Sequence, residues 1–240
     1  MEGILLVDKP AGWTSFDVVN RVRFMVAKIE GKKPKNTKVG HTGTLDPAAT
    51  GLLVLLVGKN YTRRAETLTK KDKVYEVEMT LGKVSTTGDI EGEITEVSDL
   101  QPSEQQIKDA LAAWTGDIMQ TPPAFSAIKI DGQRAYDLAR KGQEFKIEPR
   151  PAIIHANDFQ DYTYPIVHFT SHVGSGTYIR SLVDDIGKQL GSGAYMSALR
   201  RTRVASHDIA DAITPADLTP ELIQERLLQL PDVTTSAVVA

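Results

Sequence analysis

The residues best suited to chemistry lie in one polar loop, 38–51, which carries His41 and Asp46 among three glycines and a proline. The loop leads directly into the apolar run 52–57. Glycine and proline fix a backbone path, and a carboxylate on such a path just before a buried strand indicates a positioned reactive group. For an isolated Asp-Pro pair, a capping Asp in a tight strand connection is the alternative. His41 and Asp46 are therefore our first candidates for an acid and base pair.

The composition is that of a soluble protein with room for a sizeable core. Of its 240 residues, 41% are hydrophobic and 25% charged, which allows one large domain or two small ones. The chain has no cysteine, so a disulfide framework, a thiolate metal site and a cysteine nucleophile are excluded. The apolar run 3–7 is too short for a secretion signal, and no run reaches the length of a membrane span. We predict a cytoplasmic protein with no membrane partner.

Charge is distributed unevenly along the chain. The net charge is -3, yet residues 1–75 hold 14 basic against 7 acidic side chains, and the rest of the chain is acidic. Phosphates sense a local patch within a Debye length, so an acidic total does not exclude RNA. Solvated surface charge explains such runs equally well. The basic clusters are Lys32-Lys33-Pro34-Lys35, Lys38, Arg63-Arg64, Lys70-Lys71 and, late in the chain, Arg200-Arg201 with Arg203.

Hydrophobic periodicity predicts interleaved helices and strands. One amphipathic helix begins at Thr14 or Ser15 and ends at Gly31, and a second begins at Ser103 and ends at Gly116. Two further helix starts in the tail place a proline in the first helical position, at Thr214-Pro215 and Thr219-Pro220. Strands are expected at 3–7, 52–57, 73–81, 93–97, 165–173 and 196–206.

A third amphipathic helix follows the glycine-rich segment 174–177 and ends at Gly191. Arg180 falls in its first turn, where a positive charge opposes the helix dipole by up to about 1 kcal/mol. We expect a carboxylate to compensate it. Residues 119–151, bounded by prolines at both ends, look like an insertion with a basic helical piece at 135–141. It is interpreted either as a mobile flap over a site or as a surface hairpin without function.

The sequence lacks the motifs of several common kinds of catalytic and metal-binding site. The chain contains neither a phosphate-binding loop nor a nucleophile elbow. His168 and His172 share a strand face and could bind a metal, but no third ligand stands near them in the sequence. Asp89, Glu91 and Glu93 lack the full ligand series of a calcium loop. We therefore predict no metal site.

Six motifs run in order over residues 1 to about 215. They are Asp8-Lys-Pro-Ala-Gly-Trp-Thr-Ser, Gly40-His-Thr-Gly-Thr-Leu-Asp-Pro-Ala-Ala-Thr-Gly, Lys73-Val-Tyr, Pro123-Ala-Phe-Ser-Ala-Ile-Lys, Gly176-Thr-Tyr-Ile-Arg-Ser-Leu and Leu199-Arg-Arg. In this combination the chain resembles the TruB family of bacterial tRNA pseudouridine-55 synthases. The resemblance implies an α+β protein with the pseudouridine synthase fold: a mixed, largely antiparallel sheet flanked by helices, with residues 119–151 as an RNA-gripping thumb.

The resemblance also implies the reaction. Uridine becomes pseudouridine when the bond from N1 to C1′ breaks, the uracil rotates and C5 joins C1′, with no net redox change and therefore no cofactor. The family's carboxylate matches Asp46, and attack at C6, at C1′ or through a glycal stays open. Arg180 matches the arginine that pairs with this carboxylate. Because water at C1′ would release uracil, the site must be sheltered.

The target base must leave its stack in the RNA, at a cost of a few kcal/mol. Tyr75 matches the family's stacking tyrosine, whose hydroxyl is a candidate proton-abstracting base. Tyr178 and Leu199 match residues that line the uracil pocket. His41 matches a histidine that fills the space vacated in the RNA, a role distinct from acid catalysis.

The implied protein is a monomer whose partner is the T-stem loop of tRNA, with no DNA partner. Residues 1–213 would form the catalytic domain and 214–240 a short helical tail without a separate RNA-binding domain. With six acids and one arginine from His207 onward, that tail predicts weaker, more salt-sensitive RNA binding than in longer relatives. Two alternatives stay open. One is a non-catalytic RNA-binding module, and the other is a metal-dependent hydrolase using His41, Asp46, His168 and His172.

Overall fold

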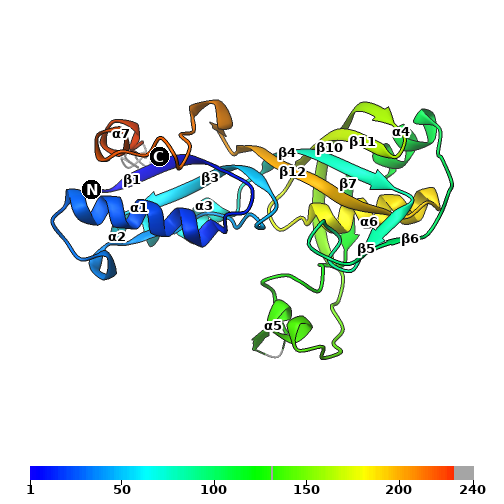
Figure 1. Ribbon diagram of the computed structural model, residues 1–240, viewed down its shortest axis with the longest axis horizontal. Helices are drawn as coiled ribbons and strands as arrows, with labels where there is room; N and C mark the ends of the chain where they lie inside the picture. Colours follow the sequence, from blue (N-terminus) through cyan, green and yellow to red (C-terminus); the bar gives the residue numbers. More distant parts are fainter. Residues whose placement is uncertain (131, 230–240) are drawn as a thin grey trace, which may run out of the picture. The chain divides into compact units, whose positions relative to one another are not determined.

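The computed structural model describes residues 1–130 and 132–229, and these form two compact units (Figure 1). Unit 1 combines residues 1–47 and 51–69 with the chain from 207 onward. Unit 2 combines residues 48–50 with residues 70–206. Each unit is described by itself.

Unit 1 is built on an antiparallel sheet whose central strand is β3, Thr50–Val57. β3 pairs along one edge with β1, Gly3–Lys9, and along the other with β2, Val39–His41. Its residues from Gly51 onward are all buried, as expected for a continuous apolar strand covered on both faces. The other elements are α1 (Ser15–Ile29), η1 (Pro34–Asn36), α2 (Lys59–Thr62), α3 (Ala65–Thr69), β13 (His207–Asp208), η2 (Ile209–Asp211) and α7 (Pro220–Arg226).

The predicted first helix is confirmed as α1, and it begins with a capping box. The Thr14 hydroxyl oxygen accepts the backbone N–H of Asp17 at 3.1 Å, and the Asp17 carboxylate accepts the backbone N–H of Thr14 at 2.8 Å. Such a cap stabilises a helix by about 1 kcal/mol. Val18, Val22 and Val26 recur at helical spacing and are buried in the core of unit 1.

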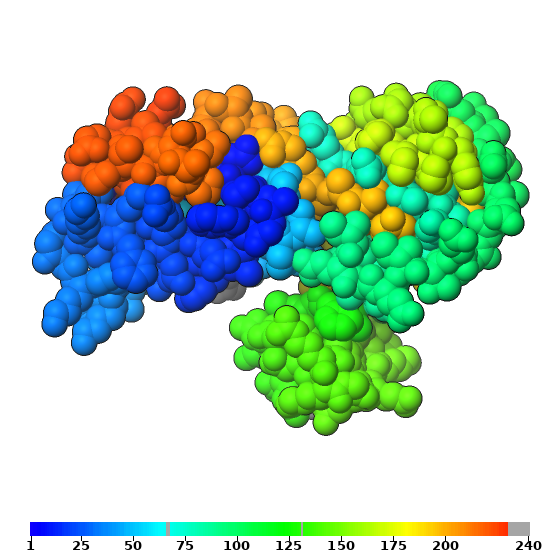
Figure 2. Space-filling view, in the orientation of Figure 1, coloured from blue at the N-terminus to red at the C-terminus, as the bar shows by residue number. Residues whose placement is uncertain are grey.

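The described C-terminal segment packs against the N-terminal strand within unit 1, as the neighbouring blue and red surfaces in Figure 2 show. Ile4 and Leu228 each donate a backbone N–H to the carbonyl oxygen of the other at 2.8 Å. The predicted helix start at Thr219 is confirmed by α7. The predicted start at Thr214 is wrong, because this segment forms a turn in which the Thr214 hydroxyl donates to Asp217 at 2.6 Å.

A helix from Pro215 would have run into Pro220, which disfavours the helical conformation in the residue before it. Residues 230–240 of the predicted tail, 214–240, lie outside the described residues. The predicted boundary at residue 213 stays a prediction.

Unit 2 contains a larger antiparallel sheet in the order β12, β4, β11, β10, β7. Its strands are β4 (Lys73–Leu81), β7 (Gly116–Gln120), β10 (Arg150–Thr163), β11 (Ile166–Val173) and β12 (Ala194–Val204). Two hairpins and three helices complete the unit: β5 (Lys83–Ser85) with β6 (Ile94–Glu96), β8 (Lys129–Ile130) with β9 (Gln133–Arg134), α4 (Glu104–Ala113), α5 (Ala135–Arg140) and α6 (Ile179–Leu190).

The two faces of this sheet differ. Val77, Met79 and Phe169 point to one face and are buried. Helix α6 packs on β12 and β4, and α4 packs on β10 and α6 (Figure 1). On β11 the alternate residues His168 and His172 point to the other face, because successive side chains of a strand alternate. The predicted α+β architecture with a largely antiparallel sheet is confirmed.

β10 is absent from the predicted elements, although it is the longest strand. Register shifts between Ile154 and Ala156 and between Phe159 and Asp161 interrupt its alternation, so no period of two is visible in the sequence. Met119 and Pro151, the predicted ends of the insertion, pair with each other in the sheet. The insertion therefore leaves the sheet only between its two paired ends, and its predicted basic helix is confirmed as α5.

Within the described residues, no helix has the length and apolar character needed to cross a membrane.

Candidate active site

In unit 1, the loop that carries Asp46 is tied to the start of α1 through Ser15. The buried Ser15 hydroxyl donates to the carbonyl oxygen of Leu45 at 3.0 Å and accepts the backbone N–H of Leu45 at 2.9 Å. The Leu45 side chain is itself buried. The residue before Asp46 is thus held by two hydrogen bonds and by packing.

The residue after Asp46 is held by a buried lysine. The Lys9 ammonium group donates to the carbonyl oxygens of Pro10 at 3.0 Å, Trp13 at 2.7 Å and Pro47 at 3.2 Å. Pro47 also accepts the backbone N–H of Gly12 at 2.9 Å. An ammonium group has three donors, and carbonyl partners offset part of the cost of burying its charge. The backbone at Asp46 is therefore fixed from both sides.

Asp46 and His41 are half-buried on this loop. The Nδ1 atom of His41 accepts the backbone N–H of Gly43 at 3.2 Å, so Nδ1 carries no proton and Nε2 is the donor of the neutral ring. Of the loop glycines, Gly51 has a φ of 103°, which side chains rarely adopt. A Cβ at Gly40 would meet only ordinary contact with Thr62, at 3.7 Å. Steric contact within the protein therefore does not require glycine at position 40.

In unit 2, Arg180 lies in the first turn of α6 and is buried. Its guanidinium group donates to the carbonyl oxygens of Thr87 at 3.0 Å and Phe125 at 2.8 Å. Its Nε atom lies 3.5 Å from the carboxylate of Asp89. The expected carboxylate partner of Arg180 is therefore present in unit 2, as Asp89.

Asp89 is 3% exposed and is itself fully engaged. One carboxylate oxygen accepts the Thr87 hydroxyl at 2.5 Å and the backbone N–H of Glu91 at 3.0 Å, and the other faces Arg180. Gly88 brings this turn close to the helix, because its φ is 78° and a Cβ there would lie 3.3 Å from the Arg180 Cβ. The acidic turn that resembled an incomplete calcium loop is thus a structural partner of Arg180.

Tyr178 caps the start of α6, and Gln120 holds its backbone. The buried Gln120 amide donates to the Tyr178 carbonyl oxygen at 3.1 Å and accepts the Tyr178 backbone N–H at 2.8 Å. Ser181 donates to the carbonyl oxygen of Thr121 at 2.8 Å. These bonds connect the helix that carries Tyr178 and Arg180 to the base of the insertion.

Tyr75 and Leu199 lie on the neighbouring strands β4 and β12. Tyr75 is 8% exposed and pairs across the strands with Arg201, which is buried. Lys73 lies two residues before Tyr75, and burial, reinforced by the charge of Arg201, lowers its pKa to about 8. Leu199 is half-buried, and its carbonyl oxygen accepts the Thr50 hydroxyl at 3.4 Å.

The six predicted site residues thus fall into two groups. His41 and Asp46 share a loop in unit 1, and the other four, Tyr75, Tyr178, Arg180 and Leu199, belong to unit 2. Within unit 2, Tyr178 and Arg180 are joined by one helix start and Tyr75 and Leu199 by one strand pair. That the two groups act on one base stays a prediction.

The two histidines of β11 do not share a metal. Four residues along a strand separate them by about 13 Å. His168 contacts Asp161 and Glu78, at 2.8 Å and 3.2 Å, whereas the ring of His172 stacks at 4.6 Å from that of His155. The ligand set of the hydrolase alternative therefore does not assemble around these two histidines.

Sequence reasoning missed three residues that position this machinery: Lys9, Asp89 and Gln120. Lysine is seldom buried, so no pattern marks Lys9 as internal. Asp89 stands far from Arg180 in the sequence. Gln120 is a strand end with no signal beyond the prolines that follow it.

The comparisons place the chain in a family. The model of the TruB family pseudouridylate synthase N-terminal domain matches residues 31–179, and that of the tRNA pseudouridylate synthase B C-terminal domain matches residues 180–230. The chain belongs to the TruB family of pseudouridylate synthases. The match of residues 180–230 covers most of the segment in which a short tail was predicted.

Curated relatives agree. A protein of Opitutus terrae described as tRNA pseudouridine synthase B is 42% identical, with 89% of this chain and 86% of that protein covered. One of Protochlamydia amoebophila with the same description is also 42% identical, covering 91% of this chain and 80% of the relative.

Solved structures confirm the fold. A chain in a crystal structure of a Cbf5–Nop10–Gar1 complex aligns with a TM-score of 0.65 at 30% identity, over 90% of this chain and 53% of that chain. A chain in an H/ACA RNP bound to a substrate RNA containing 2′-deoxyuridine aligns at 0.64 and 27%, over 93% and 55%. The present chain thus spans about half of each. The predicted pseudouridine synthase fold is confirmed.

Proposed function

We propose that this protein isomerises uridine to pseudouridine in the T-loop of tRNA, at position 55, with Asp46 as the reactive carboxylate. Membership of the TruB family supports the reaction, and relatives described as tRNA pseudouridine synthase B support the tRNA substrate. The observation that carries the assignment to Asp46 is the fixing of its two neighbours. Hydrogen bonds to Leu45 and Pro47 set the backbone at this position.

Fixing the backbone matters because the carboxylate must meet one atom of the base or the sugar. Holding reacting groups in place converts a bimolecular encounter into an effectively unimolecular step. The reaction breaks the bond from N1 to C1′ and makes one from C5 to C1′, so atoms and electrons balance without an oxidant or a reductant. Attack at C6, at C1′ and through a glycal all begin with this carboxylate.

The remaining predicted residues would bind the RNA or balance charge in the site. Tyr75 would stack on the flipped base and recover about 1–3 kcal/mol of the lost stacking. Tyr178 and Leu199 would line the uracil pocket, and His41 would occupy the vacated space in the RNA. Arg180 would balance the charge of Asp46, in addition to its contacts with Asp89, Thr87 and Phe125.

The test is an assay with an unmodified tRNA transcript, in which pseudouridine is mapped by carbodiimide modification and primer extension. Wild-type protein should form product at the T-loop uridine. Asp46→Asn should bind the transcript and form none, because the amide cannot act as the nucleophile. Asp117→Asn, an exposed carboxylate on β7, is the matched control and should retain activity.

The outcomes separate the parts of the proposal. Product in the Asp46→Asn variant would overturn the assignment of the nucleophile. Product at another uridine would overturn the position but keep the reaction. Binding without product in wild type would favour the non-catalytic RNA module, and loss of product on adding a chelator would favour metal-dependent chemistry.

A further inference from the structure

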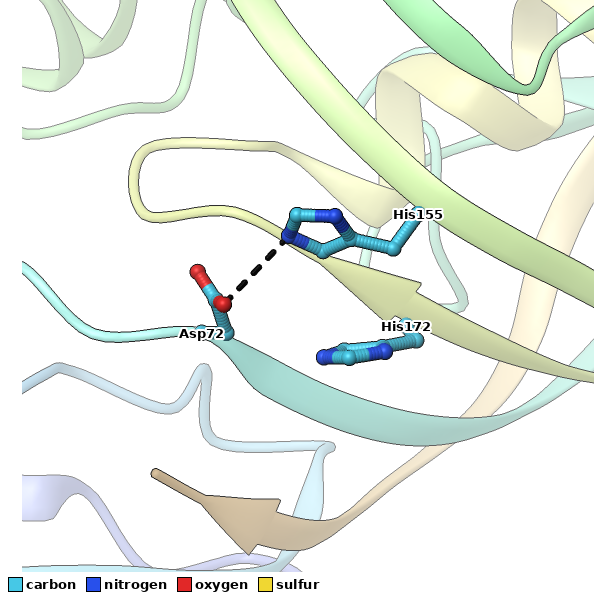
Figure 3. Close-up of side chains that lie close together, drawn as sticks. All are labelled: Asp72, His155 and His172. Carbon is cyan, nitrogen blue, oxygen red and sulfur yellow. Dashed lines mark ion pairs between the residues drawn. The ribbon is translucent and has the colours of Figure 1, made fainter.

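Three side chains of unit 2 converge on the sheet face opposite Tyr75 (Figure 3). Asp72 precedes β4, His155 lies on β10 and His172 on β11, and one ligand atom of each lies within 4.8 Å of the others. The His155 Nε2 atom is 3.4 Å from an Asp72 carboxylate oxygen. The two imidazole rings lie 4.6 Å apart between centroids, tilted by 45°.

His155 lies at an irregularity in the sheet, beside the position of His172. Ile154 pairs with Val173 and Ala156 with His172, which leaves His155 as the extra residue of a β-bulge. Bulges redirect a side chain and are common next to functional sites. Without the extra residue, His155 would itself stand opposite His172 and the pattern beyond it would shift by one.

We propose that Asp72, His155 and His172 bind a divalent transition-metal ion such as Zn²⁺, with water in the remaining positions. Two imidazole nitrogens and one carboxylate oxygen are donors that zinc and its neighbours in the first transition row prefer. Bonds of about 2.0–2.1 Å in a tetrahedron separate adjacent ligand atoms by about 3.3–3.4 Å. The separation between His155 and Asp72, 3.4 Å, already has this value.

The other ligand distances require small side-chain rotations, which the site permits. Asp72 and His155 are exposed and His172 is half-buried, so the first two can turn toward an ion.

A hollow of about 330 Å³ adjoins the cluster and gives it access to solvent. Its lining includes Asp72 and His172, but also the basic side chains Lys71 and Arg203. These charges oppose a cation and would favour an anion. A substitution that neutralises Arg203 should therefore strengthen metal binding and weaken anion binding. This difference distinguishes the two classes of ligand.

His168, on the same strand, provides a matched control. Its Nδ1 faces Asp161 and its Nε2 faces Glu78, so carboxylates occupy both ring nitrogens from opposite sides. A single ion cannot use both nitrogens of one ring. Substitution of His168 should therefore leave metal binding at the Asp72–His155–His172 cluster unchanged.

The bound ion would link the start of β4 to β10 and β11. His172 pairs with Val74 in β4, whereas Tyr75 pairs with Ser171, so the ion and Tyr75 would lie on opposite faces of the sheet. We therefore expect the ion to stabilise unit 2 without entering the uridine reaction. Binding to the folded state raises its stability with the logarithm of the ligand concentration relative to the dissociation constant, and the melting temperature rises accordingly.

The experiment uses the full chain without a polyhistidine tag, stripped with chelator and then titrated with Zn²⁺ by calorimetry and with Co²⁺ by visible absorption. We expect one ion per chain, a Co²⁺ ligand-field band and a raised melting temperature. His155→Ala and Asp72→Asn should weaken binding by more than about tenfold. His168→Ala should match wild type, and Arg203→Gln should bind more tightly.

Two results would overturn the inference: Zn²⁺ binding that is no tighter in wild type than in His155→Ala, or phosphate binding that Arg203→Gln abolishes while Zn²⁺ binding is absent. Pseudouridine formation is measured in parallel with and without chelator. Equal product in both would leave the metal site outside the reaction. Metal binding by a protein that forms no pseudouridine would support this inference and count against the proposed function. Pseudouridine formation by a protein that binds no metal would do the reverse.

Discussion

Asp46 and Asp89 are carboxylates in two short loops of the molecule, and the protein holds them in different ways. The loop of Asp46 is fixed through its neighbours, by Ser15 on Leu45 and by Lys9 on Pro47. Asp89 is fixed through its own oxygens, which meet Arg180, Thr87 and Glu91. The backbone bonds of Leu45 and Pro47 would survive a change of the Asp46 side chain, whereas the bonds made by the Asp89 carboxylate would be lost or weakened by a change of that side chain.

This difference indicates which of the two carboxylates can be the reactive group. A carboxylate that holds the fold together cannot leave its partners to attack a substrate. A carboxylate on an independently fixed backbone can be replaced without loss of the fold, and the cost then appears in activity. Stability and activity measurements on matched variants of the two loops test this distinction.

The largest effect on stability is expected at Asp89. Asp89→Asn should lower the free energy of unfolding by about 3 kcal/mol, because it removes the carboxylate charge that faces the buried guanidinium group of Arg180. Urea denaturation of both variants measures the difference. Asp46→Asn, which leaves the hydrogen bonds to Leu45 and Pro47 intact, should lower the free energy of unfolding by less than Asp89→Asn does, while abolishing product. An equal loss of stability in the two variants would break the comparison.

A smaller effect is expected from the lysine that fixes the Asp46 loop. Lys9→Met should cost about 2 kcal/mol, because it removes the hydrogen bonds of the buried ammonium group to the carbonyl oxygens of Pro10, Trp13 and Pro47. Product formation should fall as well, since Pro47 adjoins the reactive carboxylate. Lys28→Met, an exposed lysine of α1, should stay within about 0.5 kcal/mol of wild type. Full activity in Lys9→Met would show that the hydrogen bonds of Lys9 are not needed to position Asp46.

The sequence predicts the local elements of the fold but not the side chains, Ser15 and Lys9, that fix the Asp46 loop. Local signals sufficed for α1, which has a capping box, for β4 with its alternating residues and for α6, which ends at Gly191 in the left-handed conformation. The loop of Asp46 was also evident, because glycine, proline and a carboxylate stand together in the sequence.

Long-range contacts were not predictable. The bond of Arg180 to Asp89 and the burial of Lys9 depend on how distant segments pack, and no local period reports that. The bulges of β10 broke the alternation that would have revealed the strand. Missing β10 concealed His155, and with it the third ligand whose absence had argued against a metal on His172.

A substitution of Ser15 tests whether its hydrogen bonds to Leu45 fix the Asp46 loop, and a smaller effect is expected. Ser15→Ala should cost about 1–2 kcal/mol, because the buried N–H and carbonyl of Leu45 both lose a partner. In unit 2, Ser181→Ala removes a single hydrogen bond, to Thr121, and should cost less. Thermal denaturation and the pseudouridine assay should rank Ser15→Ala as the more damaging variant in both. The reverse ranking would argue against a loop held through Leu45.

The smallest expected effect concerns His168, an exposed counterpart of the buried ion pair at Asp89. Hydrogen bonding to Asp161, and also to Glu78, raises the pKa of His168 above its ordinary value of 6.5. The stabilisation is fully present below pH 6.5 and is lost as the pH rises through the raised pKa. Because the ring is exposed and its ion pairs are screened, the contribution is below about 1 kcal/mol. Wild type should therefore lose slightly more stability than His168→Gln between pH 6 and pH 8, measured by urea denaturation at each pH. A parallel pH dependence in the two proteins would show that the carboxylates around His168, unlike the one beside Arg180, contribute nothing measurable to stability.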